Sequence, residues 1–285
     1  MSKPFTLAGY NIAATPHEGY PYPDILDYLS RQSICVTYHG KQKALISVQS
    51  SSKELIIGSI RTFTDIDPNN TWINIETGSA VPANEQQKLA ATIGEKRPDF
   101  REHQFIFTKS GIEPVHTMIV DVSEITILNV ERLLRKLFNE SSVLVNFRDQ
   151  VAFVEVTTIP NYDDLSRVLS LACITKIRVT ATRKNPDDTG LGKDIFDRQM
   201  RSMRARRGVV EFTAQDKSGL NINADFKELV REEARDGLIE IKARDEQNRH
   251  VDYTSKNKPL SVDVPRDRPL LSSMMESLAR FKLGV

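Results

Sequence analysis

The stretch 224-ADFKELVREEARDGLIEIKARDEQNRHVDYT-254 decides the fold class. Its first part predicts a helix over Ala224–Asp236, which Gly237 ends. Leu238–Arg244 then has the pattern of a strand, turns at Gln247-Asn248 and returns as a second strand, Arg249–Thr254. Because a hairpin requires antiparallel pairing, this stretch predicts an α+β protein and not a purely parallel α/β sheet.

The residues before this stretch alternate predicted strands with predicted helices. One amphipathic helix follows from apolar residues at helical spacing: Ile127, Val130, Leu134, Leu137 and Phe138. The other elements are the strands Val151–Thr158, Ile174–Ala181 and Val209–Gln215, a helix opened by Asn161, the helix Lys193–Arg207 and a last helix from Pro269. Such alternation is typical of parallel units, but hairpins at both ends of the chain require antiparallel pairs as well. We therefore predict an α+β fold with mixed, mainly antiparallel sheets, flanking helices and two domains.

The first half of the chain is richer in strands. Predicted strands are Phe5–Ala13, Ile34–Tyr38, Ala44–Gln49, Leu55–Thr64 and the hairpin of Gln104–Thr108 with Val115–Val122. Two short helices, Asp24–Arg31 and Glu85–Ile93, interrupt them. Since strand-rich sequence gives way to alternation near Ser123, the predicted domains are residues 1–122 and 123–285.

Composition and charge describe a soluble globular protein. The chain has 285 residues, 39% of them apolar and 27% charged, and a net charge of +1. No apolar run approaches the ~20 residues that span a bilayer, and the amino terminus lacks the core of a signal peptide. Cys35 and Cys173 lie far apart in apolar sequence, which favours reduced structural thiols and a cytoplasmic protein.

The charges are unevenly distributed. Residues 176–207 contain ten basic and four acidic residues, so this segment carries +6. Part of the pattern complements a helix dipole, with aspartates in the first turn and arginines in the last. The dipole does not require Arg over Lys, however, and the planar guanidinium is the side chain that grips phosphate. The segment therefore favours a nucleic-acid contact, with a solvated face or a subunit interface as the alternative.

The predicted phosphate contacts fall into two ranks. The first rank is Arg198, Arg201, Arg204, Arg206 and Arg207. The second rank is Arg183, Lys184, Lys242, Arg244, Arg249 and Lys256, several of which lie in the carboxy-terminal hairpin. Because the guanidinium fork grips phosphate, we expect duplex DNA to be bound largely through its backbone phosphates.

Signals for catalysis are weak. Asp65 and Asp67 would project from one strand face, and Glu240 with Lys242 would share another, so either pair permits a metal-dependent nuclease. A turn rich in Asn and Pro also explains Asp65 and Asp67, and the solvent-exposed side of a half-buried strand also explains Glu240 and Lys242. No histidine pair has metal-ligand spacing, and no motif calls for a cofactor. A non-enzymatic module that binds an acidic protein partner is a third hypothesis.

The order of elements resembles that of the RexA phage-exclusion proteins of temperate phages. The similarity is carried by Val151–Val156 with Pro160 and the helix Asp163–Leu171, and by Ile239–Glu246 with Tyr253–Lys256. Phe105–Phe107 and the hairpin before Thr126–Phe138 match in order and spacing. The amino terminus departs from that family through an added strand and a Pro-rich loop around Pro16–Pro23.

The resemblance implies a cytoplasmic, dimeric DNA-binding protein that senses an infecting phage and works with a membrane-protein partner. It implies no catalytic residues. The chain is also similar to an uncharacterised bacterial family from antiviral gene neighbourhoods. The last helix independently favours a homodimer, because it has more apolar surface than one helix face usually needs: Leu271, Met274, Met275, Leu278 and Phe281.

Overall fold

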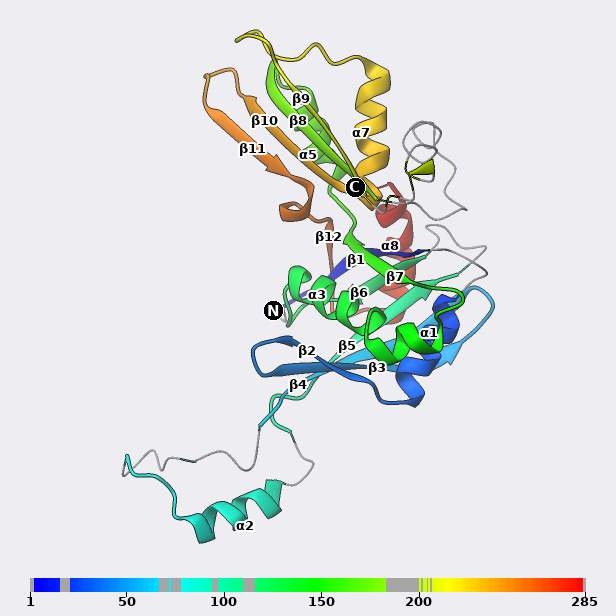
Figure 1. The fold of residues 1–285 in the computed structure, drawn as a ribbon, viewed down its shortest axis with the longest axis vertical. Coiled ribbons are helices and arrows are strands. Elements are labelled where there is room, and N and C mark those ends of the chain that lie inside the picture. The colour runs from blue at the N-terminus through cyan, green and yellow to red at the C-terminus, as the bar shows by residue number, and fades with distance from the viewer. Residues whose placement is uncertain are drawn as a thin grey trace.

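The chain folds around two antiparallel sheets that follow one another along an elongated molecule (Figure 1). The structure is a computed structural model. It describes residues 3–15, 21–66, 72, 78–93, 97–109, 116–182, 200, 202, 203, 205 and 207–283.

The larger sheet has eight strands in the order β12-β1-β6-β5-β4-β3-β2, with β7 also paired to β1. Its strands are β1 Phe5–Thr15, β2 Cys35–His39, β3 Gln42–Ser51, β4 Leu55–Thr64, β5 Arg101–Thr108, β6 Thr117–Asp121, β7 Phe153–Thr158 and β12 Ser261–Val264. The long strand β1 is the centre of this arrangement. On one side it pairs with β6, and on the other its first half pairs with β12 and its second half with β7.

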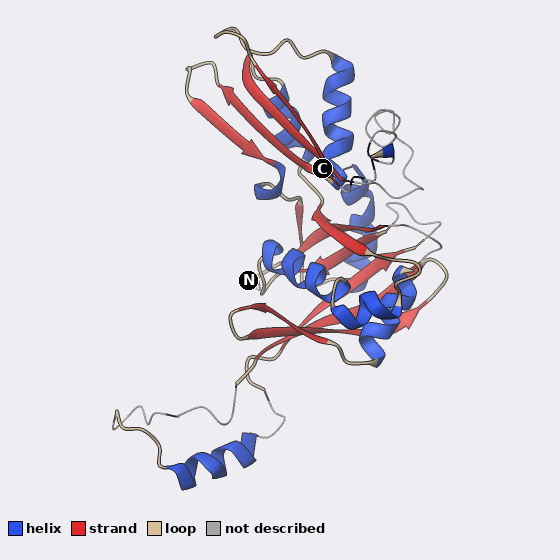
Figure 2. Cartoon of the chain, viewed as in Figure 1, coloured by secondary structure: helices blue, strands red, loops and turns tan. Residues whose placement is uncertain are grey.

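Helices cover both faces of the larger sheet (Figure 2). Helices α1 Tyr22–Arg31, α3 Ile127–Phe138 and α4 Ser141–Asn146 contribute to the main core, whereas α8 Leu270–Leu283 packs on the opposite face. The close approach of α8 requires Gly9 in β1, because a Cβ there would lie 2.7 Å from both the Ile159 and Phe281 side chains. Burial on both faces explains why β1 is buried without a break from residue 7 to residue 14.

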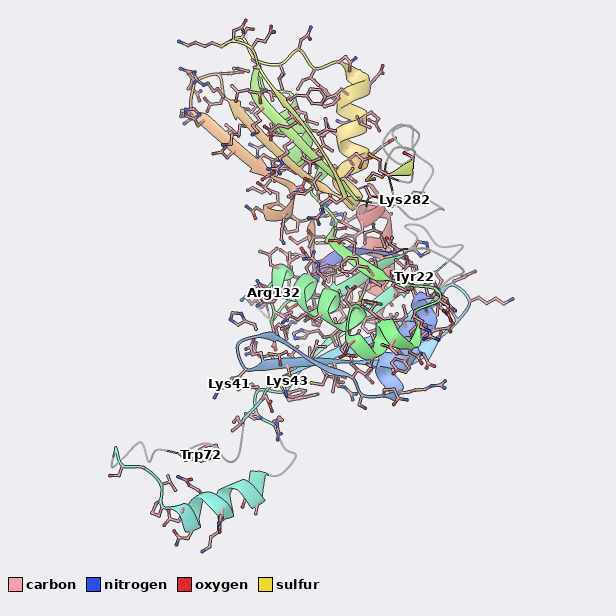
Figure 3. All side chains as sticks on the ribbon, viewed as in Figure 1. Tyr22, Lys41, Lys43, Trp72, Arg132 and Lys282 are labelled. Carbon is pink, nitrogen blue, oxygen red and sulfur yellow. The ribbon has the colours of Figure 1, made fainter. Side chains whose placement is uncertain are left out.

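An arm leaves the larger sheet between β4 and β5. It carries α2 Ala83–Ile93, which lies apart from both sheets (Figure 1). Trp72 lies on the same arm, away from the body of the molecule (Figure 3).

The smaller sheet has the order β11-β10-β8-β9 and is built from two α-β-β units. The first unit is α5 Tyr162–Leu169, β8 Cys173–Thr182 and β9 Arg207–Thr213; the second is α7 Ala224–Asp236, β10 Leu238–Arg244 and β11 His250–Thr254. Strands β8 and β10 pair antiparallel at the centre, so the two units are related by an approximate two-fold axis. Both helices pack on one face of the sheet.

The α+β class and most elements agree with the sequence prediction. The bounds of β4, α7 and β10 coincide with those predicted. Every pairing in the described strands is antiparallel, where mixed sheets were predicted. Helix α4 and strand β12 were missed, and Arg207 opens β9 instead of closing a helix.

The predicted division at residues 122/123 stays a prediction, but the sheets follow a different grouping. The larger sheet takes β7 and β12 from beyond that boundary, and its cores include α3, α4 and α8. Residues 162–254 alone form the smaller sheet and the two helices that cover it.

Two expectations about exposure need correction. Cys35 and Cys173 are free thiols, but Cys35 is exposed because the alternation of β2 turns Val36 and Tyr38 inward. The apolar stripe of α8 is used within the chain, since Met274, Leu278 and Phe281 are buried against the larger sheet. Only Leu271 and Met275 of that stripe are exposed, so α8 no longer argues for a dimer.

Candidate functional site

A polar cleft of about 520 Å³ lies where the smaller sheet meets α3 and β7 of the larger one. The short helix η1 Ser255–Asn257 borders it. Four basic side chains from four elements line the cleft: Arg135 of α3, Arg178 of β8, Arg207 of β9 and Lys256 of η1. Three carboxylates accompany them: Glu131, Glu155 and Glu240. The cleft therefore gathers charge from both sheets.

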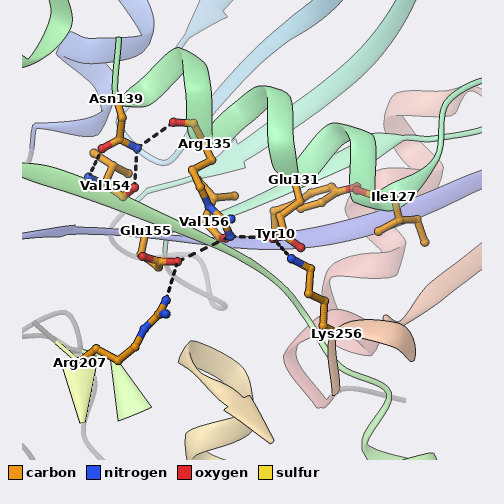
Figure 4. Close-up of polar contacts among 10 residues, drawn as sticks. All are labelled: Tyr10, Ile127, Glu131, Arg135, Asn139, Val154, Glu155, Val156, Arg207 and Lys256. Atoms are coloured by element: carbon orange, nitrogen blue, oxygen red, sulfur yellow. Dashed lines mark hydrogen bonds and ion pairs between the residues drawn. The ribbon is translucent and has the colours of Figure 1, made fainter. Parts of the chain in front are cut away.

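Helix α3 supplies one wall of the cleft. Its N-cap, Thr126, accepts a hydrogen bond from the Asn129 N–H, and Ser and Thr are preferred at this position. Glu131 and Arg135 lie one turn apart and therefore on the same face, with Arg135 Nη2 at 2.6 Å from Glu131 Oε1. Arg135 Nη2 also donates to the Val156 carbonyl of β7 at 2.8 Å (Figure 4).

Asn139, at the end of α3, hydrogen-bonds to the backbone along the outer edge of β7. Its amide nitrogen donates to the Val154 carbonyl at 2.7 Å, and its amide oxygen accepts from the Val154 N–H at 2.9 Å (Figure 4). One side chain thus replaces a neighbouring strand at this point. The result is a fixed register between α3 and β7, which holds Arg135 and Glu155 on the same side of the cleft.

Two ion pairs cross the cleft between the larger sheet and the smaller one. Arg207 Nη2 lies 3.7 Å from Glu155 Oε1, which is also 3.6 Å from Arg135 Nη2. Lys256 Nζ lies 3.3 Å from Glu131 Oε1 (Figure 4). The two carboxylates are nearly buried, with side-chain exposures of 5% for Glu131 and 12% for Glu155, whereas Arg207 is 56% exposed. Buried carboxylates therefore hold accessible cations at the mouth of the cleft.

The cleft continues onto the face of the smaller sheet that its helices leave uncovered, which we call the open face. Because Ile239, Ile241 and Ala243 are buried under the helices, the alternation of β10 turns the residues between them outward. The basic side chains of the open face are Lys176, Arg178, Lys242 and Arg244, and the acidic ones are Glu211, Glu240 and Asp252. Lys176 Nζ lies 2.7 Å from Glu211 Oε1, and this hydrogen bond lowers the pKa of the Glu211 carboxyl.

The structure brings together some of the predicted phosphate contacts. Arg207 and Lys256 lie in the cleft, and Lys242 and Arg244 lie on the open face. Arg249 lies in the β10–β11 turn, where its Nε donates to Asp245 at 2.8 Å. The others lie outside the described residues: Arg183, Lys184, Arg198, Arg201, Arg204 and Arg206.

Sequence reasoning missed Arg135 and Arg178 as site residues. Arg135 forms an i,i+4 pair with Glu131, and such pairs are usual on solvated helix faces. Arg178 alternates with Ile177 and Val179 in β8, which marks only the polar side of a strand. The one available signal was that both residues belong to the polar side of an otherwise buried element, α3 and β8 respectively.

Asp65 and Glu240, two of the residues considered for metal chemistry, lie in different parts of the molecule. Asp65 lies at the end of β4 and pairs with Lys43 at 2.7 Å and Arg97 at 2.9 Å; Figure 3 places Lys43 at the base of the arm. Glu240 lies in the cleft, 3.7 Å from Arg178. Asp67 is outside the described residues. Within the described chain, no group of three His, Cys, Asp or Glu side chains is placed to hold a metal ion.

A second polar pocket, of about 340 Å³, lies between the start of α3 and strands β2 to β5. His103 lines it and is buried, and this burial lowers the pKa of its imidazole. His103 is therefore neutral near pH 7 and adds no charge to this pocket. For polyanions, the cleft is the stronger candidate site.

None of the described helices is both long and apolar enough to cross a bilayer. No curated protein matches this chain. One family matches it over both sheets, from β1 into α8: the chain belongs to the family described as a domain of unknown function, DUF4747, whose model matches residues 3–280.

Proposed function

We propose that this protein binds duplex DNA mainly through backbone phosphates, at the cleft and along the open face. The observation that carries the proposal is the convergence of Arg135, Arg178, Arg207 and Lys256 on one cleft. These residues come from elements far apart in the sequence. A solvated helix face alone would not bring them together.

The ion pairs of Arg178 and Arg207 leave these two arginines able to bind phosphate, whereas Arg135 is held 2.6 Å from Glu131 Oε1. The closest contacts of Arg178 with Glu240 and of Arg207 with Glu155 are both 3.7 Å, which is beyond hydrogen-bond distance. A guanidinium has five N–H donors in a planar fork, and a phosphate oxygen pair fits that fork better than one distant carboxylate. The glutamates orient these cations before the DNA arrives.

The accompanying carboxylates also limit affinity and specificity. Glu131, Glu155 and Glu240 offset much of the positive charge in the cleft. We therefore expect moderate affinity that depends on salt and varies little with base sequence. The resemblance to the RexA proteins supports a role for this binding in phage exclusion or antiviral defence, with signalling to a membrane-protein partner.

The test is a titration of labelled duplex DNA between 50 and 200 mM salt. If about four phosphates are neutralised, the log–log slope is about −3.6 and affinity falls roughly 100-fold over this range. Arg178→Glu with Lys256→Glu should weaken binding at least tenfold and reduce the slope by about 2, since two phosphate contacts outside β9 are lost. Arg31→Glu is the matched control, because Arg31 is 76% exposed on α1, outside the cleft.

A flat salt dependence, or equal losses in the cleft variant and the Arg31 control, would contradict the phosphate-binding site. The same titration with Mg²⁺ tests the nuclease alternative. Cleavage that Glu240→Ala abolishes would make the cleft a catalytic site, whereas we expect the DNA to stay intact.

A further inference from the structure

Strand β9 is an unprotected edge of the smaller sheet. It pairs with β8 on one side, and no described strand or side chain hydrogen-bonds to its other side. It is seven residues long, with Val209 50% and Phe212 45% exposed, and it contains no Lys, Pro or bulge. Natural sheets usually protect their edges with such features, because an open edge can pair with another strand.

The other edges in the described chain are shorter or covered. Strand β12 has four residues, and β2 and β11 have five each. Strand β2 also has an irregularity between Thr37 and His39. The outer edge of β7 is covered by the Asn139 and Arg135 side chains. Strand β9 is therefore the edge best suited to accept another strand.

The sequence of β9, Arg207-Gly-Val-Val-Glu-Phe-Thr213, is complementary to itself in the antiparallel sense. If two copies pair with Val209 opposite Val209, Arg207 of each lies opposite Glu211 of the other. Opposite charges in cross-strand pairs stabilise a sheet, and the central pair is β-branched on both sides. A one-residue shift would lose both charge pairs, so the charges select a single register.

We propose that β9 pairs antiparallel with β9 of a second copy of this chain, with the two-fold axis at Val209. The two smaller sheets then form one continuous sheet whose axis is perpendicular to its faces. The two partners use the same surface, as a closed two-fold dimer requires. This pairing gives the predicted homodimer a surface that does not involve α8.

The pairing has a consequence for DNA, and this consequence rests on the proposed function. An axis perpendicular to the sheet places the two open faces on the same side, so Arg178 and Lys176 of both copies face one direction. A duplex lying across them would contact twice as many basic side chains. Pairing without DNA depends only on β9.

Charge reversal across the axis tests the pairing by sedimentation without DNA. Arg207→Glu or Glu211→Arg alone places like charges opposite each other and should raise the dimer Kd at least tenfold. The double variant Arg207→Glu/Glu211→Arg restores opposite charges and should return the Kd to within about threefold of wild type. Circular dichroism checks that each variant is folded.

Cysteine cross-linking gives an independent readout. Directly opposite residues in an antiparallel pair have Cα atoms about 4.5–5.5 Å apart, within the range that a disulfide can bridge. In a Cys35→Ser/Cys173→Ser background, Val209→Cys should give an oxidised dimer. Asp252→Cys on β11, the opposite edge of the same sheet, is the control and should stay monomeric on denaturing gels.

Three results would overturn the pairing: a wild-type monomer at 50 µM without DNA, a double variant as weak as the single ones, or equal cross-linking at both edges. Dimerisation and DNA binding fail separately in these assays. A dimer that ignores DNA contradicts only the proposed function. A monomer with salt-dependent DNA binding contradicts only the β9 pairing.

Discussion

At the scale of single residues, the sequence suggested that Asp65 could bind a metal ion. In the fold, Asp65 instead forms ion pairs with Lys43 and Arg97. Its hydrogen bonds with Lys43 and then Arg97 lower the pKa of the carboxyl below its usual value. The folded-state pKa is thus below the unfolded-state value of about 3.9. Asp65 therefore contributes stability above about pH 4 and loses it as the pH falls through the folded-state pKa.

We expect Asp65→Asn to lower the free energy of unfolding by about 1 kcal/mol at pH 7, because two partly exposed ion pairs are lost. The difference from wild type should shrink toward pH 3, because the carboxyl of the unfolded chain, with a pKa of about 3.9, is then mostly protonated. Urea denaturation at both pH values measures it. Asp27→Asn, which removes one exposed i,i+4 pair, is the control. A loss that persists unchanged at low pH would show that the charge is not the cause.

At the scale of elements, α8 packs its apolar residues on the larger sheet. Phe281 is 2% exposed and packs against Gly9 of β1, whereas Leu271 is 42% exposed. We expect Phe281→Ala to lower the free energy of unfolding by about 3–5 kcal/mol, since it leaves a cavity in the core. Leu271→Ala on the same helix should cost less than about 0.5 kcal/mol.

Urea denaturation compares these two variants, and sedimentation tests whether either one changes the oligomeric state. Because α8 is not the proposed interface, the dimer Kd of Leu271→Ala should equal that of wild type. A large rise in that Kd would return the interface to α8 and would contradict the role assigned to β9.

At the scale of the whole molecule, the larger sheet is assembled from both ends of the chain. Strand β1 needs β7 and β12 on one side, and the cores on the two faces need α3 and α8. We expect a fragment of residues 1–122 to lack a cooperative unfolding transition, because it would expose these apolar faces. A fragment of residues 160–259 keeps the smaller sheet and both of its helices, and should unfold cooperatively.

Thermal denaturation followed by circular dichroism, together with proton chemical-shift dispersion, distinguishes these outcomes. A cooperative transition in fragment 1–122 would restore the domain boundary expected from composition. If fragment 160–259 is unfolded instead, the smaller sheet depends on its contacts with α3 and β7.

Local sequence determined most elements of this protein. Asn161 caps α5 as predicted, and Thr126 caps α3, each accepting backbone N–H groups of the following turn. Gly237 ends α7 as predicted, and the fold supplies the reason: a Cβ there would lie 2.1 Å from the Thr180 carbonyl. These features depend on hydrogen bonds and side-chain periodicity within a few residues, so sequence alone reveals them.

Only the tertiary structure decided which strands pair and which charges meet. Thr6 donates to Asp263, 257 positions away, and no local pattern specifies that β12 returns to β1. The meeting of Arg135, Arg178, Arg207 and Lys256 has the same origin, because each residue belongs to the polar side of a different element. Strand pairing and cleft formation follow from burying apolar faces that lie far apart in the chain, and each polar side takes its place as a consequence of that packing.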